Sequence, residues 1–292
     1  MVTRRSVLVP LLFGPLFPRL LLSQSRPLFS ALAALEIRSR GKLGCAVLDL
    51  AKDKHTRLCI GQRMDERFPM CSTFKFLVTT LILKRVEDRQ EQLDRRVTYT
   101  RADLLSYSPV TEKHLNDGMT ISQLCEASMT MSDNTAANLL LDSFGGPPAL
   151  NAFLRSIGDT TTRLDRAEPA LNEAKPGDAR DTTTPATMAE NLHRILFGEV
   201  VPFRYRTILT NWLMANRTGD TRLRAGLPRN WKIGDKTGSG EHGTTNDIAV
   251  IWPPHRPPVL VTAYLTQSPL DDNSRNAILA DVGRAITNTF TA

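Results

Sequence analysis

The sequence predicts an α+β fold of three layers (α/β/α), in which an antiparallel sheet carries helices on its faces and an all-helical domain is inserted into the chain. Runs typical of strands lie near both ends of the 292 residues, and runs with helical periodicity fill the middle. Apolar residues make up 41% and charged residues 23%, which is ordinary for a folded globular protein. A sheet built from both chain ends around a helical insertion is the simplest arrangement that buries these elements.

The change of pattern along the chain sets the expected boundaries. We expect a signal peptide in residues 1–30, a discontinuous α/β domain in residues 31–66 and 217–292, and a helical domain in residues 67–216. The helical domain includes a long segment, residues 163–181, that is polar, rich in Pro and Gly and without periodicity. Loops of this length inside a compact domain often carry function.

The first residues have the pattern of a secretory signal. Arg4 and Arg5 precede an apolar run from Val7 to Phe17, and no acid occurs before Glu36. The paired arginines also resemble a twin-arginine export signal. We therefore expect an exported protein, periplasmic or secreted, that keeps no membrane anchor after cleavage near Ser30 to Ala33.

The elements follow in order from their apolar patterns. A helix is expected over residues 30–40, and Leu43 to Asp49 pairs with Thr56 to Ile60 as a hairpin. Apolar residues from Phe74 to Ile82 recur at spacings of three and four, which predicts a buried helix. The remaining predicted helices are Ser122–Met131, Thr135–Phe144, one with Pro148 in its first turn, Pro185–Leu196, Phe203–Ala215 and Ser274–Phe290; the remaining strands are Trp231–Lys236, Asp247–Trp252 and Val259–Thr266.

Charge, histidine and cysteine usage exclude several functions. The net charge is +7, but residues 1–30 hold four arginines and no acid, so the rest carries 7 − 4 = +3, too small an excess to indicate nucleic-acid binding. The histidines are isolated, so we expect no metal and no cofactor. Cys45 and Cys59 lie on neighbouring predicted strands, where either a disulfide or two buried free thiols would fit.

The first chemical motif is Ser72-Thr73-Phe74-Lys75. Residues three apart share one face of a helix, so the Ser72 hydroxyl and the Lys75 ammonium can meet. A serine becomes a nucleophile when a base takes its proton, and a lysine can be that base only if its pKa is lowered. By itself this spacing also fits an ordinary surface pair.

Three further motifs are each open to two interpretations. Ser132-Asp133-Asn134 fits a helix-capping turn or a set of catalytic polar groups. Lys236-Thr237-Gly238 ends a predicted strand; it fits a strand running into a glycine turn, or a strand edge that binds an extended substrate. Glu168 and Asn172 fit a solvated loop, or a carboxylate and an amide that share one water.

In this order and at these separations, the four motifs resemble the serine penicillin-recognising enzymes, and specifically the class A β-lactamases. The segments that carry the resemblance are Phe68–Phe76, Arg163–Asp181 and Lys236–Asp247. The resemblance covers nearly the whole chain after residue 30. It implies hydrolysis of the amide bond of penicillins and cephalosporins by a monomer, at a site between the two domains, with an Ω-loop closed by an Arg166–Asp181 ion pair.

The resemblance also implies roles in catalysis. Ser72 would attack the lactam carbonyl, and the backbone N–H groups of Ser72 and Ser239 would form the oxyanion hole. Lys75 would assist proton removal, although either Lys75 or Glu168 could be the base. Ser132 would pass a proton to the lactam nitrogen, and Glu168 would position the water that releases the acyl group.

Other residues would bind the substrate. By the resemblance, Asn134 would contact the side-chain amide, Asn172 would hold the water with Glu168, and Tyr107 would form an aromatic wall. The substrate carboxylate would be held by the strand residues Lys236, Thr237 and Ser239, with Gly238 leaving room for the approach.

Two departures from the family pattern bear on specificity. Thr245 stands where many relatives have an arginine that supports carboxylate binding, and Arg222 could supply that charge or be a surface residue. Carbapenem-hydrolysing relatives bridge the cysteine before the nucleophile to one just past the strand motif. Here Gly240 takes the second place, so Cys71 cannot form that bridge and no specialised carbapenemase is expected.

Two alternatives share the Ser-Lys pair. A D-Ala-D-Ala transpeptidase or carboxypeptidase lacks an acid placed to hydrolyse the acyl-enzyme quickly. A β-lactam sensor domain stays acylated and is normally tethered to a membrane partner. Glu168 with Asn172 favours the hydrolase over both.

Overall fold

The computed structural model describes residues 20–51 and 59–291, with side chains from residue 27 onward. Residues 1–19 of the expected signal peptide and the first part of the expected strand Thr56–Ile60 lie outside the described residues. Helix α1, Leu20–Ser39, begins about ten residues before the predicted helix over residues 30–40. No helix in the described part of the chain is long and apolar enough to span a membrane.

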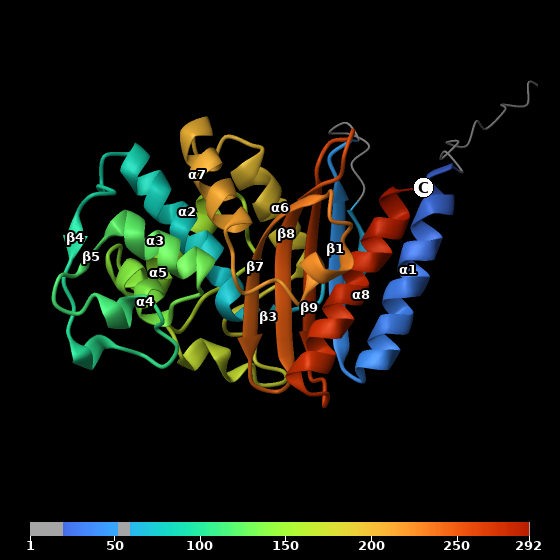
Figure 1. Cartoon of the computed structure of the whole chain (residues 1–292), viewed down its shortest axis with the longest axis horizontal. Coiled ribbons are helices and arrows are strands. Elements are labelled where there is room, and N and C mark those ends of the chain that lie inside the picture. The colour runs from blue at the N-terminus through green and yellow to red at the C-terminus, as the bar shows by residue number, and fades with distance from the viewer. Residues whose placement is uncertain (1–19, 52–58, 292) are drawn as a thin grey trace, which may run out of the picture.

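A five-stranded antiparallel sheet joins the two ends of the chain (Figure 1). The strand order is β2-β1-β9-β8-β7, and Ala46 of β1 pairs with Thr262 of β9. This sheet confirms the predicted α+β fold class. The strands are β1 Lys42–Asp49, β2 Cys59–Gln62, β7 Lys232–Gly240, β8 Thr244–Trp252 and β9 Val259–Thr266.

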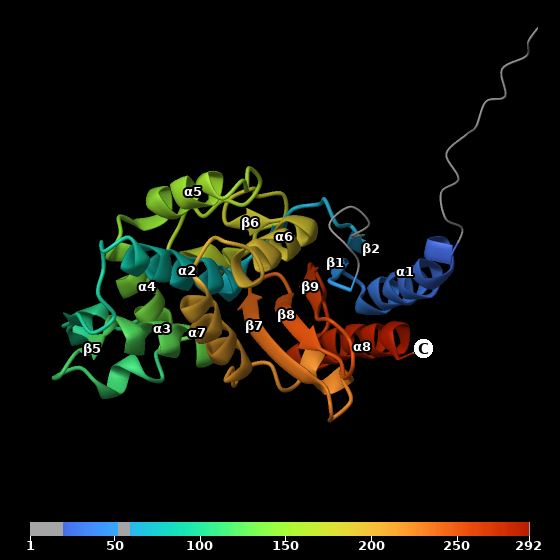
Figure 2. The same ribbon diagram turned by 90° about the horizontal axis from the view of Figure 1, so that it is seen from above.

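Helices cover both faces of the sheet (Figure 2). On one side lie α1 and α8, Asp272–Phe290, and on the other lie α6, Pro185–Leu196, and α7, Phe203–Met214. Neighbouring residues of β9 point to opposite faces, so Val261 joins the core with α1 and α8, while Leu260 joins the core with the helical layer. Both faces are therefore buried, which explains the nearly continuous apolar runs.

The helical layer is built around α2, Phe74–Glu87, whose first ten residues are all buried. The other helices are α3 Ile121–Thr130, α4 Asn134–Asp142 and α5 Gly146–Ser156. Two short strand pairs complete the layer: β3 Phe68–Pro69 with β6 Thr182–Thr183, and β4 Arg96–Val97 with β5 Met119–Thr120. It also contains the 3₁₀ turns η1 Cys71–Thr73, η2 Arg101–Asp103, η3 Thr111–Lys113 and η4 Ala170–Glu173. A fifth 3₁₀ turn, η5 Leu223–Gly226, lies beside α8.

The cysteines are free thiols. Cys45 packs into the core beneath α1 and α8, whereas Cys59 packs against the core on the other face of the sheet. A disulfide between them would have to pass through the sheet, so free thiols are the correct interpretation, with Cys45 buried and Cys59 partly buried. Burial raises the pKa of the Cys59 thiol to about 11.

Candidate active site

The polar motifs meet in a cleft of about 460 Å³ between strand β7 and the helical layer. Six separate stretches of chain contribute: η1, the loop that carries Tyr107, the turn before α4, the loop of residues 163–181, the segment between α7 and η5, and the end of β7. The lining residues are Ser72, Tyr107, Ser132, Asn134, Asn172, Arg217, Thr218, Arg222, Thr237, Gly238 and Ser239.

Ser72 lies in η1, one turn before the regular helix α2, and Lys75 occupies the first turn of that helix. The Lys75 Nζ donates to Ser72 Oγ at 2.9 Å, as the spacing of the motif predicts. Lys75 is completely buried, and this burial lowers the pKa of its ammonium, while the carboxylate of Glu168, 3.0 Å away, opposes the shift. The lysine is therefore held as part of a buried ion pair.

The turn before α4 presents Ser132 to two lysines. Ser132 has a left-handed backbone, with φ of 56°, and its hydroxyl accepts from Lys236 Nζ at 2.9 Å. Lys75 Nζ lies 3.4 Å from the same hydroxyl and 2.8 Å from the Ser132 carbonyl. The Asn134 Oδ1 accepts from Lys75 Nζ at 2.7 Å, so the second motif is locked onto the first.

Asp133 shows that the capping interpretation of this turn is also correct. Its Oδ1 accepts from the backbone N–H of Ala136 at 2.9 Å and so caps α4. Its Oδ2 accepts from the N–H groups of Val110 and Thr111, both at 2.9 Å. The cap thus ties the turn to the loop that carries Tyr107, which is 58% exposed at the mouth of the cleft.

Glu168 reaches the nucleophile from the loop of residues 163–181. It is 4% exposed, and its Oε1 accepts from Ser72 Oγ at 3.1 Å. Asn172 Nδ2 donates to Glu168 Oε2, so the acid and the amide are in contact. Asn138, which was not predicted from the sequence, holds the Glu168 backbone by donating to its carbonyl at 2.9 Å and accepting from its N–H at 3.0 Å. Asn138 follows Asn134 by one turn of α4, so both lie on the same face of the helix. This spacing was the sequence signal that could have identified Asn138 as a residue of the site.

The base of this loop is closed by the expected ion pair. Arg166 Nε lies 2.6 Å from Asp181 Oδ2, and Asp181 Oδ1 accepts from the N–H groups of Asp165 and Arg166 at 2.7 and 2.9 Å. The Asp181 carbonyl accepts from the Met70 N–H at 2.9 Å, just before the turn that carries the nucleophile. The loop and the nucleophile are therefore positioned by one connected set of bonds.

Strand β7 continues through the third motif as far as Gly240, which corrects the prediction that it ends at Lys236. The strand lies directly against the nucleophile turn. A Cβ on Gly238 would stand 2.8 Å from the Met70 carbonyl and 3.2 Å from the Ser72 nitrogen, so only glycine permits this approach. A Cβ on Gly240 would stand 2.7 Å from Cys71 Sγ.

Two more cations support this strand. Lys236 is fully buried, and its burial, together with the neighbouring cations Lys75 and Arg222, holds the pKa of its ammonium well below its usual range. Arg222 is only 8% exposed, so it is not a surface residue. Its guanidinium donates to the Gly238 carbonyl at 2.8 Å and to Ser239 Oγ at 2.7 Å.

Two other residues that line the cleft, Arg217 and Thr218, were not predicted from the sequence. They lie between α7 and η5, and the Thr218 hydroxyl is hydrogen-bonded to the Thr237 hydroxyl. No motif surrounds them in the sequence, so only the folded structure could identify them.

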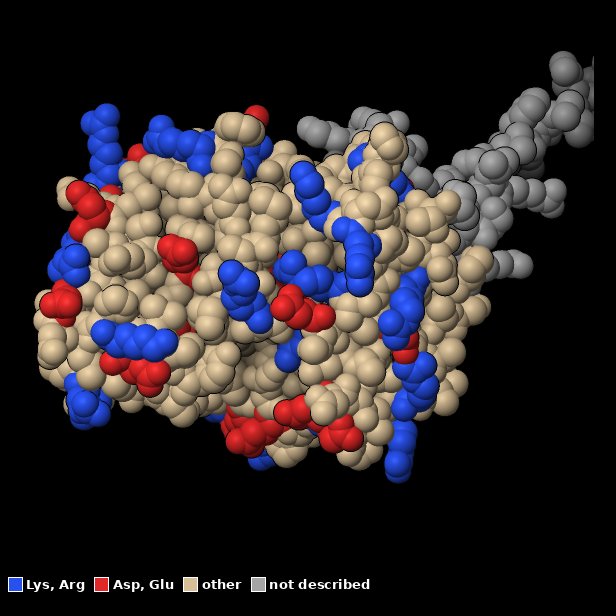
Figure 3. Space-filling model, viewed as in Figure 1, with Lys and Arg blue, Asp and Glu red and all other residues tan. Residues whose placement is uncertain are grey.

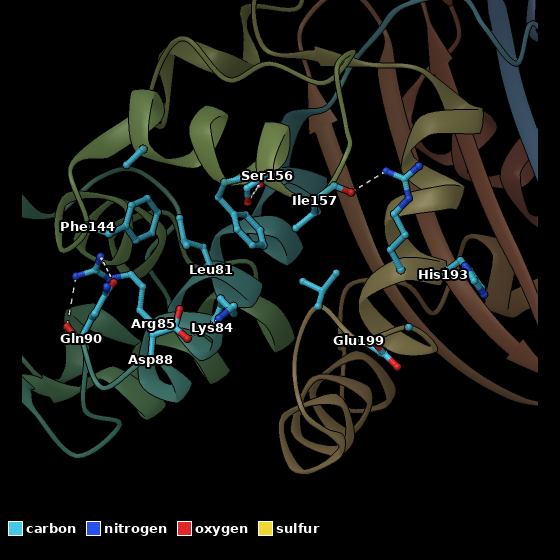
Figure 4. A pocket seen from close by; sticks show the side chains of 15 residues that line it. Leu81, Lys84, Arg85, Asp88, Gln90, Phe144, Ser156, Ile157, His193 and Glu199 are labelled. Atoms are coloured by element: carbon cyan, nitrogen blue, oxygen red, sulfur yellow. Dashed lines mark hydrogen bonds and ion pairs between the residues drawn. The ribbon is translucent and has the colours of Figure 1, made fainter.

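A second hollow, of about 610 Å³, lies at the opposite end of α2 (Figure 4). Leu81, Phe144 and Ile157 form part of its wall, and Lys84 and Asp88 pair with each other at its edge. It contains no serine–lysine or serine–carboxylate pair among its lining residues, so its larger volume does not make it a catalytic site.

A sheet with an adjoining helical layer, and a buried serine that contacts a lysine and a carboxylate between them, define a serine hydrolase of the penicillin-recognising type. The family model described as "Beta-lactamase enzyme family" matches residues 27–290. The chain belongs to this family, and its similar structures and relatives are class A β-lactamases.

Named relatives agree across most of the chain. β-Lactamase L2 of Stenotrophomonas maltophilia is 50% identical, over 86% of this chain and 82% of that protein. β-Lactamase OXY-1 of Klebsiella oxytoca is 48% identical, over 88% and 87%. An ancestral class A β-lactamase (GNCA) is 60% identical with a TM-score of 0.87, over 90% of this chain and 100% of that chain.

Proposed function

We propose that this β-lactamase works through an acyl-enzyme on Ser72 that Glu168 helps to hydrolyse. One observation carries the proposal. The Ser72 hydroxyl lies 2.9 Å from Lys75 Nζ and 3.1 Å from Glu168 Oε1, with the lysine and the carboxylate both buried. A nucleophile, a cation and a base thus share one site from which bulk water is excluded.

The hydrogen bonds favour Glu168 as the first proton acceptor. Lys75 Nζ has three protons and four oxygen neighbours within 3.0 Å, on Ser72, Ser132, Asn134 and Glu168. It therefore acts as a donor, and it stabilises the negative charge that develops on Ser72 Oγ. As Oγ bonds to the lactam carbonyl carbon, its proton passes to Glu168 Oε1.

The tetrahedral oxyanion then needs donors that are already in place. We assign this role to the backbone N–H groups of Ser72 and Ser239. The close approach of β7 to the nucleophile turn at Gly238 supports the assignment. Loss of one such donor typically lowers the rate by about 10²–10³.

Ser132 supplies the proton that the leaving nitrogen needs. Its hydroxyl lies between Lys236 and Lys75, either of which can return a proton after the lactam C–N bond breaks. Lys236, Thr237, Ser239 and Arg222 bind the substrate carboxylate on this side of the cleft. Asn134, Asn172 and Tyr107 contact the acyl side chain on the other side.

Before deacylation, Glu168 passes the Ser72 proton to Lys75 Nζ, 3.0 Å away, which replaces the proton that Lys75 delivered to the lactam nitrogen through Ser132. Deacylation then uses the same carboxylate, again ionised, in its second role. Glu168, steadied by Asn172 and Asn138, holds a water and takes its proton while the oxygen attacks the acyl carbonyl. The proton ends on Ser72 Oγ as the ester bond breaks, which restores the free enzyme.

The test is multiple turnover of a chromogenic cephalosporin by the purified protein. We expect many equivalents of product per enzyme, because Glu168 is placed to release the acyl group. A burst of about one equivalent followed by silence would instead identify a transpeptidase or a sensor.

We also propose that the protein is exported and works as a monomer. A cut between Ser30 and Ala33 would remove Leu28, which is 1% exposed and packs in the core beside α8. We therefore place cleavage before Leu28, in accord with the family match from residue 27. The intact mass of the exported protein tests the cleavage site, and light scattering tests the monomer.

A further inference from the structure

Arg217 is a cation of the catalytic cleft that the proposed mechanism leaves unused. Its backbone N–H donates to the Thr130 carbonyl at 2.9 Å, which fixes its position beside the cleft. Its side chain is exposed, and its guanidinium makes no hydrogen bond or ion pair with any residue that the structure describes. Its five N–H donors are therefore available to a ligand.

The neighbouring cations Lys236 and Arg222 donate most of their protons to the protein, which leaves one N–H on each for the substrate carboxylate. Lys236 donates to the Ser132 hydroxyl and to the Thr237 carbonyl, both at 2.9 Å. Arg222 makes four bonds, to the Gly238 and Asn246 carbonyls, to Ser239 Oγ and to Asn276 Oδ1. Figure 3 shows Lys and Arg side chains close to the hollow in the middle of the molecule, and acidic side chains along its lower edge.

The position of Arg217 relative to the substrate follows from its neighbour. The Thr218 hydroxyl is bonded to the Thr237 hydroxyl, so Arg217 lies next to the part of β7 that we propose holds the substrate carboxylate. In a cephalosporin, the C3 substituent is attached to the ring carbon adjacent to the one that carries this carboxylate. A substituent at C3 would therefore extend toward Arg217.

We propose that Arg217 is a specificity-determining residue that favours cephalosporins with an anionic C3 substituent over those with a cationic one. The inference rests on the proposed function, because it requires the carboxylate to bind at Lys236 and Thr237. An exposed charge pair contributes modestly, so we expect a preference of about two- to fivefold in kcat/KM between C3 substituents that differ by one unit of charge.

Three cephalosporins provide the test, because they share one acyl side chain and differ in charge at C3. Ceftriaxone carries an acidic triazine, cefotaxime a neutral acetoxymethyl group and cefepime a quaternary ammonium. We expect the ceftriaxone-to-cefepime ratio of kcat/KM to fall several-fold in Arg217→Gln, to fall further in Arg217→Glu and to persist in Arg217→Lys. The ratio in the unaltered protein should also decline as salt is raised.

Arg229→Glu is the matched control, because Arg229 is exposed before the start of β7 and does not line the cleft. It changes the net charge as much as Arg217→Glu does, and we expect its ratio to equal that of the unaltered protein. Equal ratios in all the Arg217 variants, or an equal loss in Arg229→Glu, would overturn the proposal. Failure of the unaltered protein to turn over the chromogenic cephalosporin would instead count against the proposed function.

Discussion

The catalytic cleft and the second hollow lie at opposite ends of helix α2, and they differ in how far their charged side chains are buried. The second hollow, called the outer hollow below, is the larger, about 610 Å³ against about 460 Å³ for the cleft. Its Lys84 and Asp88 side chains are 36% and 41% exposed, so this ion pair is in contact with solvent. In the cleft, the side chains of Lys75 and Glu168 are both 0% exposed. Burying charges is costly, so a fold that keeps them buried marks the place where they are used.

This difference in burial predicts that substitutions at the cleft end of α2 lower the activity far more than substitutions at the outer end. The largest effect belongs to Ser72→Ala, which we expect to lower the rate of chromogenic cephalosporin hydrolysis by several orders of magnitude. Removing the oxygen leaves the surrounding packing in place, so the circular dichroism spectrum should not change. Near-normal hydrolysis by a folded variant would refute the assignment of the nucleophile.

The second prediction separates the two half-reactions. Glu168→Ala removes the proton acceptor of both steps, but Lys75 Nζ, 2.9 Å from Ser72 Oγ, can replace it in acylation. General-base catalysis of deacylation, which contributes about 10²–10⁴-fold, has no such replacement, so the acyl-enzyme should accumulate. Intact-mass spectra after mixing with a penicillin should show the protein plus one penicillin. Glu173→Ala is the matched control, since Glu173 lies on the same loop, pairs with Arg166 and is 42% exposed. Equal trapping in the two variants would remove the special role of Glu168.

The third prediction concerns pH. Burial and nearby cations lower the pKa of Lys236, and we propose that its protonated form binds the substrate carboxylate. The charged form is lost as pH rises through the lowered pKa, so kcat/KM should fall at a lower pH than an ordinary lysine would allow. In Lys236→Arg, whose guanidinium stays protonated, the alkaline limb of the normalised profile should move to higher pH. An unchanged limb would show that another group titrates there.

The smallest effect belongs to the outer hollow. Lys84→Ala removes the exposed ion pair between Lys84 and Asp88, which are one helical turn apart. Such a pair stabilises the folded protein by about 0.3–0.5 kcal/mol. We expect kcat/KM to stay within about twofold of the unaltered enzyme and the thermal midpoint to fall only slightly. A large loss of activity would show that the two ends of α2 are coupled, which would break the contrast between the two hollows.

The local pattern of the chain predicted most of the elements. Helix α6, Pro185–Leu196, and strand β9, Val259–Thr266, have the predicted bounds because strong apolar periodicity decides them locally. The length of β7 was not predictable in this way. Its glycines are typical of a turn, but pairing of Ser239 with Thr245 and of Gly240 with Thr244 extends the ladder.

The sequence by itself determined which residues we propose for the chemistry, since the Ser-Lys, Ser-Asp-Asn, Glu-Asn and Lys-Thr-Gly groups are recognisable by type and spacing. Only the tertiary structure decided how they are used. Burial lowers the pKa of Lys75, and the fold encloses Arg222 behind β7. The sheet places Cys45 and Cys59 on opposite faces. Arg217 remains exposed in the cleft. The burial of a side chain and the face of the sheet on which it lies depend on contacts between segments far apart in the chain. A local sequence pattern does not record those contacts.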